Sequence, residues 1–438
     1  MPFTVKDVLK IQVAPALGCT EPVAIALGAA AAASVLENKK LDAIEIWVDP
    51  NIYKNGLAVS IPGTEGLKGL DTAAAIGAFG GNPELRMEVL DTVDEESVKL
   101  ARELLEAGKV KVNLLEDHRG LYIKTIVKSG SDEAESVIRD LHDQIVSLTL
   151  NGEDVTDTDL VSEPGSEGQG ELAAQEESLK NLSLVQLFAM VDELDENDLQ
   201  FLKKGLDLNL RLSDYGLKNG PGLGVGMALN QMAIQKTLRR DMVLSAKILT
   251  AAAADARMAG VKLPAMSSGG SGNHGLTATL PIKAVGDYLE TNETAVLKAI
   301  GFSHIITAYV KAHTGRLTAL CGCSIAAGAG AAAGITYLLG GSLNHVAGAI
   351  KNISEDLAGV ICDGAKDGCA FKLSTAAGSA VQAALFSLQG VTVMHTDGII
   401  GVSSEDTMKN IGTLATIGMV EADRTILRIM LEKQFSDY

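Results

Sequence analysis

The sequence is poor in aromatic and in basic residues. Aromatic side chains make up 4% of the 438 residues, and 37 Lys and Arg are outnumbered by 55 Asp and Glu, which gives a net charge of −18 at pH 7. Nucleic acids and anionic membrane surfaces are bound by clustered Lys and Arg, so this charge argues against both as partners. With 47% hydrophobic residues the chain can still bury a large core, and its length predicts two or three domains.

Neither a secretory signal nor a typical membrane span is evident. The N-terminus, MPFTVKDVLKIQVAPALG, carries an acid and lysines where a secretory signal has an unbroken apolar stretch, so we expect a cytoplasmic protein. Residues 317–344 are uncharged over a length that reaches across a bilayer. This run is rich in alanine and interrupted by glycine, which favours a buried helix or helix pair over a membrane protein built of small-residue helices.

Cysteine is also scarce. The chain has five cysteines, an odd and sparse count that is unlike the framework of a disulfide-bonded protein. A reducing compartment leaves such residues as thiols or as metal ligands. Cys19 stands alone, whereas the other four cysteines lie between residues 321 and 369.

The chain divides at an acidic stretch, residues 151–180, which has too few apolar residues to form a core and is predicted to be a linker. Residues 40–150 before it predict a small α+β domain. The N-terminal helices in residues 1–39 are expected to pack on the helical domain that follows this stretch. Residues 181–438 are rich in alanine and glycine and predict a compact all-helical domain. The expected fold class is therefore mainly α with an inserted α+β domain.

The periodicity of apolar residues assigns the individual elements. Short alternating or apolar runs predict strands at 43–49, 56–62, 110–116 and 120–130. Acidic starts followed by apolar residues three and four apart predict helices at 94–108 and 132–145. Alanine-rich segments predict further helices at 21–39, 225–259, 293–313, 318–340, 343–361 and 374–388.

Two cysteines one residue apart, Cys321 and Cys323, begin the run CGCSIAAGAGAAAG. In a regular helix they are about 200° apart, so that only one of them could face a metal. At a helix N-terminus, where Gly322 relaxes the backbone, the exposed N–H groups would stabilise thiolates. Cys362 and Cys369 bracket DGAKDG, a loop that can fold back and bring the two sulfurs together.

Three kinds of environment are open to these four thiols: a packed core, a zinc site or an iron–sulfur cluster. Structural zinc sites usually contain two tight C-x-x-C pairs, which the sequence lacks. A cluster held by three cysteines is as consistent with the spacing.

The stretch MSSGGSGNHG, residues 266–275, combines serines and glycines with His274. Glycines let backbone N–H groups come close to an anion, so the stretch predicts a cradle for a carboxylate or a phosphate. It is not a nucleotide-binding fingerprint, because it lacks both the G-x-G-x-x-G pattern and the Walker lysine. A histidine in such a polar loop favours a functional role over a structural one.

Two further stretches carry candidate polar groups. In GCTEP, residues 18–22, Cys19 precedes a predicted helix N-terminus that would stabilise its thiolate as a base or nucleophile. Alternatively, Thr20 is only the helix cap. The stretch NIYKNGLAVSIPGT, residues 51–64, is compatible with any hairpin. Its candidate residues, placed around a turn, are Lys54, Asn55 and Thr64.

In this order, GCTEP, KNG followed by IPGT, SGNHG, CGC before an Ala/Gly-rich helix, and ICDGAKDGC resemble the L-cysteine desulfidases, within the wider group of iron–sulfur L-serine dehydratase alpha chains. The resemblance covers nearly the whole chain. It implies a lyase of cysteine catabolism that converts L-cysteine to pyruvate, ammonia and hydrogen sulfide without pyridoxal phosphate. The nearest alternative is an L-serine dehydratase that uses the same cluster. The alternative of another class is a four-cysteine metal or redox-sensing binding module.

The resemblance also implies an oxygen-sensitive [4Fe–4S] cluster with one iron open to the substrate, which makes residues 181–438 the cluster-binding catalytic domain. Its three ligands would be Cys362, Cys369 and one of Cys321 and Cys323. The serine dehydratases carry a further cysteine at the extreme C-terminus, where this chain reads EKQFSDY. That departure favours the desulfidases.

The remaining candidates are assigned to the substrate by the same resemblance. Cys19, Glu21 and His274 would be catalytic, with Cys19 near the reacting carbon. The substrate carboxylate and amine would be bound by Lys54, Asn55, Thr64, Ser268, Gly269, Gly270, Ser271, Gly272 and Asn273. The expected partner is a small amino-acid substrate, with no nucleic acid and no membrane, and a homo-oligomer is compatible with the sequence.

Overall fold

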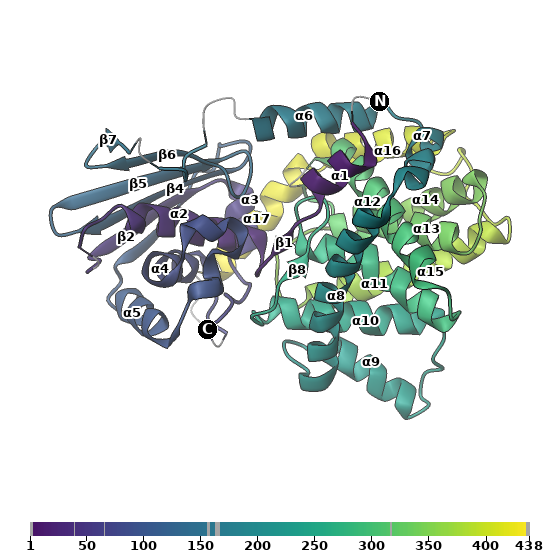
Figure 1. The fold of residues 1–438 in the computed structure, drawn as a ribbon, viewed down its shortest axis with the longest axis horizontal. Coiled ribbons are helices and arrows are strands. Elements are labelled where there is room, and N and C mark those ends of the chain that lie inside the picture. The colour runs from purple at the N-terminus through teal and green to yellow at the C-terminus, as the bar shows by residue number, and fades with distance from the viewer. Residues whose placement is uncertain are drawn as a thin grey trace.

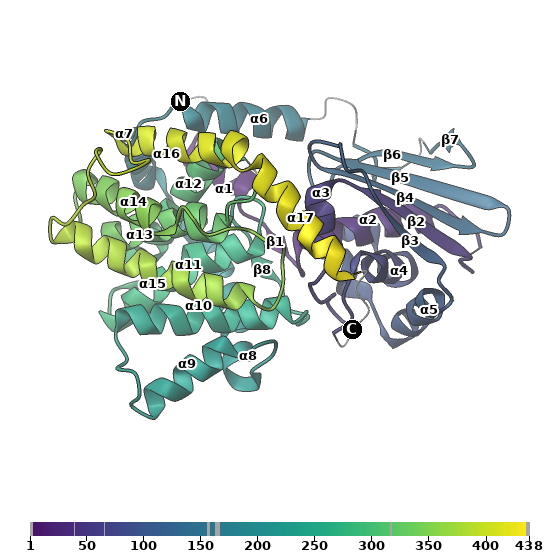
Figure 2. The ribbon, with the colours of Figure 1, turned by 180° about the vertical axis from the view of Figure 1, so that it is seen from behind.

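The computed structural model describes residues 3–38, 40–64, 66–155, 158–162, 167–315 and 318–434. It has two lobes side by side, one containing a sheet and the other built of helices (Figure 1). The sheet lobe comes from the N-terminal part of the chain. The last helix, α17 (Val420–Gln434), runs back from the helical lobe toward the sheet lobe (Figure 2). The expected fold class, mainly α with an inserted α+β portion, is confirmed.

The sheet has six strands in the order β3-β2-β4-β5-β6-β7. Only β2 and β3 are parallel, and the other neighbouring pairs are antiparallel. The sequence AIEIWV alternates, so that Ile44, Ile46 and Val48 point into the core. The strands are β2 (Ala43–Val48), β3 (Val110–Leu114), β4 (Tyr122–Ser129), β5 (Asp132–Arg139), β6 (Ile145–Leu150) and β7 (Glu153–Asp154). The strands predicted at 43–49, 110–116 and 120–130 are thereby confirmed.

Two element predictions in this lobe are wrong. Residues 132–145, predicted to be a helix, contain β5, because Gly130 at φ +60° lets the chain turn and pair antiparallel with β4. The apolar positions of DEAESVIR satisfy either period, and strand pairing decides between them. Residues 56–62, predicted to be a strand, follow helix α3 (Pro50–Gly56) as bends with one isolated bridge between Ser60 and Lys68.

Helix α2 lies on the sheet, although the N-terminal helices were expected to pack on the catalytic domain. Its alanines permit close contact: a Cβ at Gly77 of α4 would lie 2.3 Å from the Ala26 carbonyl oxygen. On the sheet side, Ser136 Oγ donates a hydrogen bond to the Gly28 carbonyl oxygen at 2.7 Å. Helix α1 does pack in the core of the helical lobe, so the expectation is wrong for α2 alone. The helices of this part are α1 (Val5–Gln12), α2 (Thr20–Ser34), α4 (Leu70–Gly80), the 3-10 segment η1 (Pro83–Thr92) and α5 (Glu95–Glu106), predicted at 94–108.

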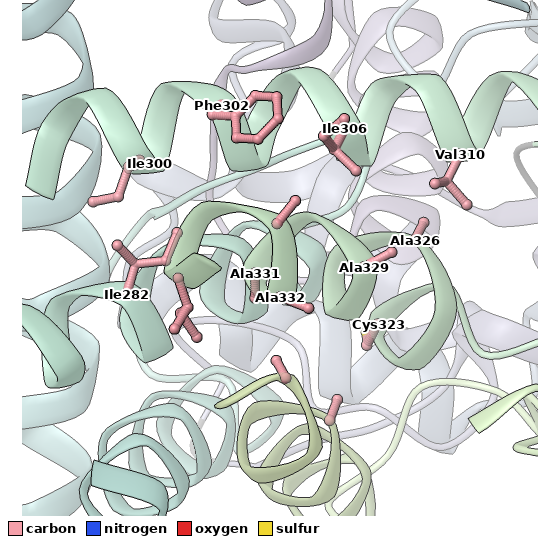
Figure 3. Packing of buried hydrophobic residues seen from close by; sticks show 14 of the residues in the cluster. Ile282, Ile300, Phe302, Ile306, Val310, Cys323, Ala326, Ala329, Ala331 and Ala332 are labelled. Carbon is pink, nitrogen blue, oxygen red and sulfur yellow. The ribbon is translucent and has the colours of Figure 1, made fainter. Parts of the chain in front are cut away.

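The helical lobe surrounds α13 with α11, α12, α14 and α15. Glycines let these helices touch: a Cβ at Gly330 would lie 2.5 Å from the Ser303 carbonyl oxygen, and one at Gly334 2.6 Å from that of Ala299. Figure 3 shows Phe302 and the isoleucines of α12 above the alanines of α13. The elements are α6 (Glu167–Lys180), α7 (Leu184–Ala189), η2 (Met190–Glu193), α8 (Glu196–Asn219), α9 (Val225–Ile234), α10 (Met242–Met258), α11 (Gly272–Tyr288), α12 (Glu293–Thr314), η3 (Cys323–Ala327), α13 (Gly328–Leu338), α14 (Leu343–Leu357), α15 (Cys369–Leu388), α16 (Ser404–Thr413) and η4 (Leu414–Gly418).

The predicted linker at 151–180 is partly ordered structure. It contains β7 and helix α6, while residues 156, 157 and 163–166 lie outside the described residues. A two-stranded sheet of β1 (Pro15–Ala16) and β8 (Ala265–Met266) ties the N-terminal segment to the helical lobe. Over the described ranges, no helix is long and apolar enough to cross a membrane.

Candidate functional site

A cavity of about 100 Å³ lies where the two lobes meet, and all five cysteines line it. We call it the thiol pocket. Its volume is several times what one buried water needs, so it has room for a small ligand. It is lined by Cys19, Thr20, Glu21, Asn55, His142, Arg257, Gly269, Gly270, Ser271, Asn273, His274, Lys311, Thr318, Leu320, Cys321, Gly322, Cys323, Cys362, Gly364, Ala365, Cys369, Lys372 and Leu373.

The backbone explains how four of the cysteines meet. Residues 319–321 run antiparallel to 360–362, with Cys321 N donating to the Val360 carbonyl at 2.9 Å and Cys362 N donating to the Ala319 carbonyl at 2.6 Å. After Cys362 the chain turns at Gly364, φ +86°, and Cys369 then begins α15. The DGAKDG loop thus turns back at Gly364, and both cysteines that bracket it line the thiol pocket.

The CGC pair lies at a helix start and not inside a regular helix. Cys321 precedes the helix, and Cys323 begins the π-helical turn η3, a geometry that is often found at functional sites. The hydrogen bond from Cys323 lowers the pKa of Cys321 to about 6, against the desolvation of its thiolate. The same bond and burial raise the pKa of Cys323, and burial raises that of Cys369 to about 11.

Cys19 is a buried thiol that donates a hydrogen bond to Glu21 Oε2 at 3.3 Å. Thr20 Oγ1 donates to the same oxygen at 2.9 Å. Burial, followed by the charge of Glu21, raises the pKa of Cys19 well above its ordinary value. The expectation that the helix N-terminus stabilises a Cys19 thiolate is thus wrong, because desolvation outweighs the helix dipole.

His274 is held in one orientation by the loop that contains it. Its Nδ1 lies 3.2 Å from the Ser268 carbonyl oxygen, which can only accept, so Nδ1 carries the hydrogen and Nε2 is an acceptor. Burial, and then the charge of Lys311, lowers the pKa of His274 to about 3, so the ring is neutral at pH 7. A Cβ at Gly322 would lie 2.4 Å from Nε2, so the central glycine of CGC is what lets the ring approach.

Arg257 of α10 is a buried cation in the lining. Its Nη1 donates to Asn273 Oδ1 at 2.9 Å and its Nη2 donates to the Gly18 carbonyl oxygen at 2.7 Å. A Cβ at Gly272 would lie 2.4 Å from Nε, so this glycine makes room for the guanidinium. The residue therefore joins the GCTEP and SGNHG segments beside a cavity that suits an anion.

Lys311 of α12 supplies a second buried cation. Its Nζ donates to the Gly315 carbonyl at 2.7 Å. Gly269 has φ +52°, and a Cβ there would lie 2.9 Å from Lys311 Cγ. Two glycines of the 266–275 loop, Gly269 and Gly272, thus leave room for two basic side chains.

The structure brings most of the predicted site residues together, from both lobes. Those that line the thiol pocket are Cys19, Glu21, Asn55, Gly269, Gly270, Ser271, Asn273, His274, Cys321, Cys323, Cys362 and Cys369. Those that do not are Lys54, Thr64, Ser268 and Gly272. The catalytic, substrate-binding and cluster-binding roles of both groups of residues stay predictions.

The four outlying residues have contacts of their own. Thr64 Oγ1 donates to the Ile61 carbonyl at 2.7 Å, and Lys54, buried in α3, forms an ion pair with Asp423 of α17. Ser268 Oγ lies 2.8 Å from Nδ1 of His304, while Gly272 packs against Arg257.

Sequence reasoning missed the basic residues of the lining. Arg257 and Lys311 are charged residues inside the apolar, alanine-rich segments AAAADARM and ITAYVKAHT. Charged side chains are rarely buried unless they are paired or functional. A charged residue inside an apolar helix was therefore the sequence signal that could have identified these two residues. His142 and Lys372 also line the pocket and are without a comparable sequence signal.

The donor set of the thiol pocket fits an iron–sulfur cluster. Thiolates are the usual ligands of such clusters, and soft sulfur donors suit iron. Within the described part of the chain, no three His, Cys, Asp or Glu side chains are grouped closely enough to hold one metal ion. In a [4Fe–4S] cluster each thiolate ligand binds a different iron, so its ligands do not meet at a single metal ion.

Comparison with known proteins gives a family. Residues 84–428 match the model of the serine dehydratase alpha chain. The chain belongs to this family. It is also 63% identical over 437 residues to a UPF0597 protein of Desulfatibacillum aliphaticivorans, covering 100% of both chains. UPF0597 proteins of Clostridioides difficile and Geobacter sulfurreducens are 42% and 40% identical, covering 97% and 98% of this chain and 98% and 99% of theirs.

Membership of the serine dehydratase alpha-chain family gives the activity its class, that of a serine-dehydratase-like lyase. The names of the UPF0597 relatives carry no substrate. The GCTEP and KNG segments precede the residues that the family model matches. They nevertheless contribute Cys19, Glu21 and Asn55 to the thiol pocket.

Proposed function

We propose that this chain catalyses the β-elimination of L-cysteine to pyruvate, ammonia and hydrogen sulfide. The observation that carries the proposal is the convergence of five cysteines with the buried basic residues Arg257 and Lys311 on one small cavity. A carboxylate needs cations, and a leaving thiol needs a soft partner. Both kinds of group line the thiol pocket, within a family of lyases.

Three cysteines would hold a [4Fe–4S] cluster: Cys362, Cys369 and one of Cys321 and Cys323. When bound, such a cluster supplies an open iron that acts as a Lewis acid toward the leaving group. We infer a cytoplasmic location, where a reducing environment keeps the cysteines as thiols.

The substrate would be oriented by its charged groups. We assign its carboxylate to Arg257 and Lys311, assisted by backbone N–H groups of residues 269–273. Nε2 of His274 would accept a hydrogen bond from the substrate ammonium. These fixed donors and acceptors would hold the Cα–H and Cβ–S bonds in a reactive geometry.

Proton transfer at Cα falls to Cys19 and Glu21, which share a proton through their hydrogen bond. Elimination breaks the Cα–H and Cβ–S bonds and forms the Cα–Cβ double bond. The resulting enamine tautomerises and is hydrolysed by one water to pyruvate and ammonia. The sulfur leaves with its electron pair as sulfide.

The second candidate is L-serine dehydration at the same site, which the family membership favours. We expect anaerobically reconstituted protein to release sulfide and pyruvate in equal amounts from L-cysteine, with a higher kcat/KM than for pyruvate formation from L-serine. The reverse preference would make the chain a serine dehydratase. A cluster spectrum that neither amino acid changes, without turnover, would instead indicate the metal or redox-sensing module.

A further inference from the structure

A second and larger cleft, of about 800 Å³, lies beside the thiol pocket. We call it the inter-lobe cleft. Helix α3 and the loop after β3 line it from the sheet lobe. From the helical lobe it is lined by η4, α17 and the residues Thr314, Gly315, Thr318 and Ala319. Figure 2 shows α17 crossing from one lobe toward α3.

The inter-lobe cleft and the thiol pocket share a wall. Thr318 lines both cavities. Lys54 lines the cleft while the next residue, Asn55, lines the pocket, and the same relation holds for Ala319 and Leu320. Residues adjacent in the chain thus line a cavity of about 100 Å³ and one of about 800 Å³.

The lining of the cleft carries four basic residues, Lys54, Arg119, Arg424 and Arg428, and three acids, Glu116, Asp117 and Asp423, so it is slightly positive in a protein whose net charge is −18. Arg424 is paired with Glu421, and Lys54 with Asp423. Arg119 and Arg428 line the cleft with exposed side chains, and no ion pair joins either of them to an acid within the described residues. Two uncommitted guanidinium groups would attract small carboxylates that the rest of the surface repels.

We propose that the inter-lobe cleft is the route by which small amino- and keto-carboxylates enter and leave the thiol pocket, and that Arg119 and Arg428 are the cations they meet first. This route shares one assumption with the proposed function, namely that the thiol pocket binds a small carboxylate. Helix α17 is then a wall of the route, docked on α3 by the Lys54–Asp423 ion pair.

The test is alkylation of the thiols in reduced, cluster-free protein, measured at each cysteine by mass spectrometry. Each pocket thiolate displaces iodide and forms an S–CH₂ bond, with anionic iodoacetate in one reaction and neutral iodoacetamide in the other. The double variant Arg119→Glu/Arg428→Glu should react with iodoacetate about tenfold more slowly at low ionic strength and with iodoacetamide at the wild-type rate. The difference should shrink in concentrated salt.

A matched variant, Arg102→Glu/Arg239→Glu, makes the same change in net charge at exposed residues outside both cavities. It should leave the ratio of the two rates at its wild-type value. The variant Arg119→Gln/Arg428→Gln removes the two charges without adding acids. It should give a ratio of iodoacetate to iodoacetamide rates between those of the wild type and the glutamate variant, which would show that the effect does not come from misfolding caused by the new acids.

A steric variant tests the same route without changing charge. Thr416→Trp, in the lining of the cleft, should slow alkylation by both reagents, whereas Thr413→Trp, exposed three residues earlier and outside the lining, should not. The route is overturned if the two rates keep their wild-type ratio in the Arg119/Arg428 variants, or if Thr416→Trp leaves both rates unchanged. The alkylation test does not measure turnover, so it is independent of the proposed function. If the alkylation pattern is as expected but the reconstituted protein releases no sulfide from L-cysteine, the proposed function is wrong and the route stands.

Discussion

Arg257 Nη2 donates a hydrogen bond to the Gly18 carbonyl oxygen at 2.7 Å, across 239 residues of sequence. This bond joins α10 of the helical lobe to the segment that carries Cys19 and Glu21. The same guanidinium holds Asn273 Oδ1 at 2.9 Å. One buried cation thus positions two of the motifs that form the thiol pocket, and in the proposed function its charge would bind the substrate carboxylate.

Replacing Arg257 by lysine should raise KM for the amino acid about tenfold, which corresponds to about 1.4 kcal/mol. Lysine keeps the charge but cannot bridge Gly18 and Asn273 with one planar group. Steady-state kinetics on anaerobically reconstituted protein would show the change. Arg211→Lys, at an exposed position of α8, is the matched control. An unchanged KM would remove Arg257 from substrate binding.

Cys19→Ser should keep the iron and sulfide content of the reconstituted protein and lose most of the activity. A serine hydroxyl can still donate to Glu21, but its higher pKa makes it a poorer partner in proton transfer. Iron and acid-labile sulfide analysis, read together with turnover, checks this expectation. Iron content that falls by half or more would make Cys19 a ligand instead.

Single alanine replacements of Cys321, Cys323, Cys362 and Cys369 should divide unevenly. Variants at Cys362, Cys369 and one of the CGC cysteines should fail to assemble the cluster, while the other CGC variant should largely retain it, because three ligands leave one iron open to the substrate. Visible absorption after anaerobic reconstitution gives the readout. Retention of iron and activity by all four variants, or active protein that contains only zinc, would refute the cluster.

Gly330→Ala should lower the free energy of unfolding by about 1–3 kcal/mol, since its Cβ would lie 2.2 Å from Thr307 Oγ1 and 2.5 Å from the Ser303 carbonyl oxygen. Gly359→Ala is the control, because nothing lies within 4 Å of the Cβ it would add. Denaturant unfolding compares the two. Equal stability of both variants would mean that α12 and α13 can separate without cost.

Asp255→Asn should alter the pH dependence of stability. Burial raises the pKa of Asp255 to about 6, so its charged form is less favourable in the folded chain than in the unfolded one. The stability it contributes is present below the ordinary pKa of 3.8 and is lost as the pH rises through about 6.

The asparagine variant lacks this loss and can still accept the hydrogen bond from Gly226 N. Relative to the wild type, it should therefore gain on the order of 1–3 kcal/mol between pH 4 and pH 7. Melting curves at the two pH values measure the gain. Asp356→Asn, at an exposed site of α14, controls for the lost charge. A difference between Asp255→Asn and wild type that does not change with pH would contradict the expectation.

Much of the candidate site could be predicted from local chemistry. The sequence shows the glycine-rich loop, the histidine within it and the paired cysteines, because each of these patterns involves residues only a few positions apart. Arg257 and Lys311 were missed, since their significance lies in where two long helices bury them. The resemblance placed Thr64 in the substrate site, yet its hydroxyl donates to the Ile61 carbonyl and the residue does not line the thiol pocket.

The sequence by itself determined most of the helical and strand periods, the alanine and glycine content that allows close helix contacts, and the cysteines, glycines and histidine that line the thiol pocket. Tertiary structure alone decided that α2 packs on a sheet and that DEAESVIR is a strand, because both segments satisfy more than one local pattern. It also decided which thiols meet, through backbone pairing of residues 319–321 with 360–362. Desolvation, which exists only once the chain is folded, made Cys19 a thiol where its position at a helix start predicted a thiolate.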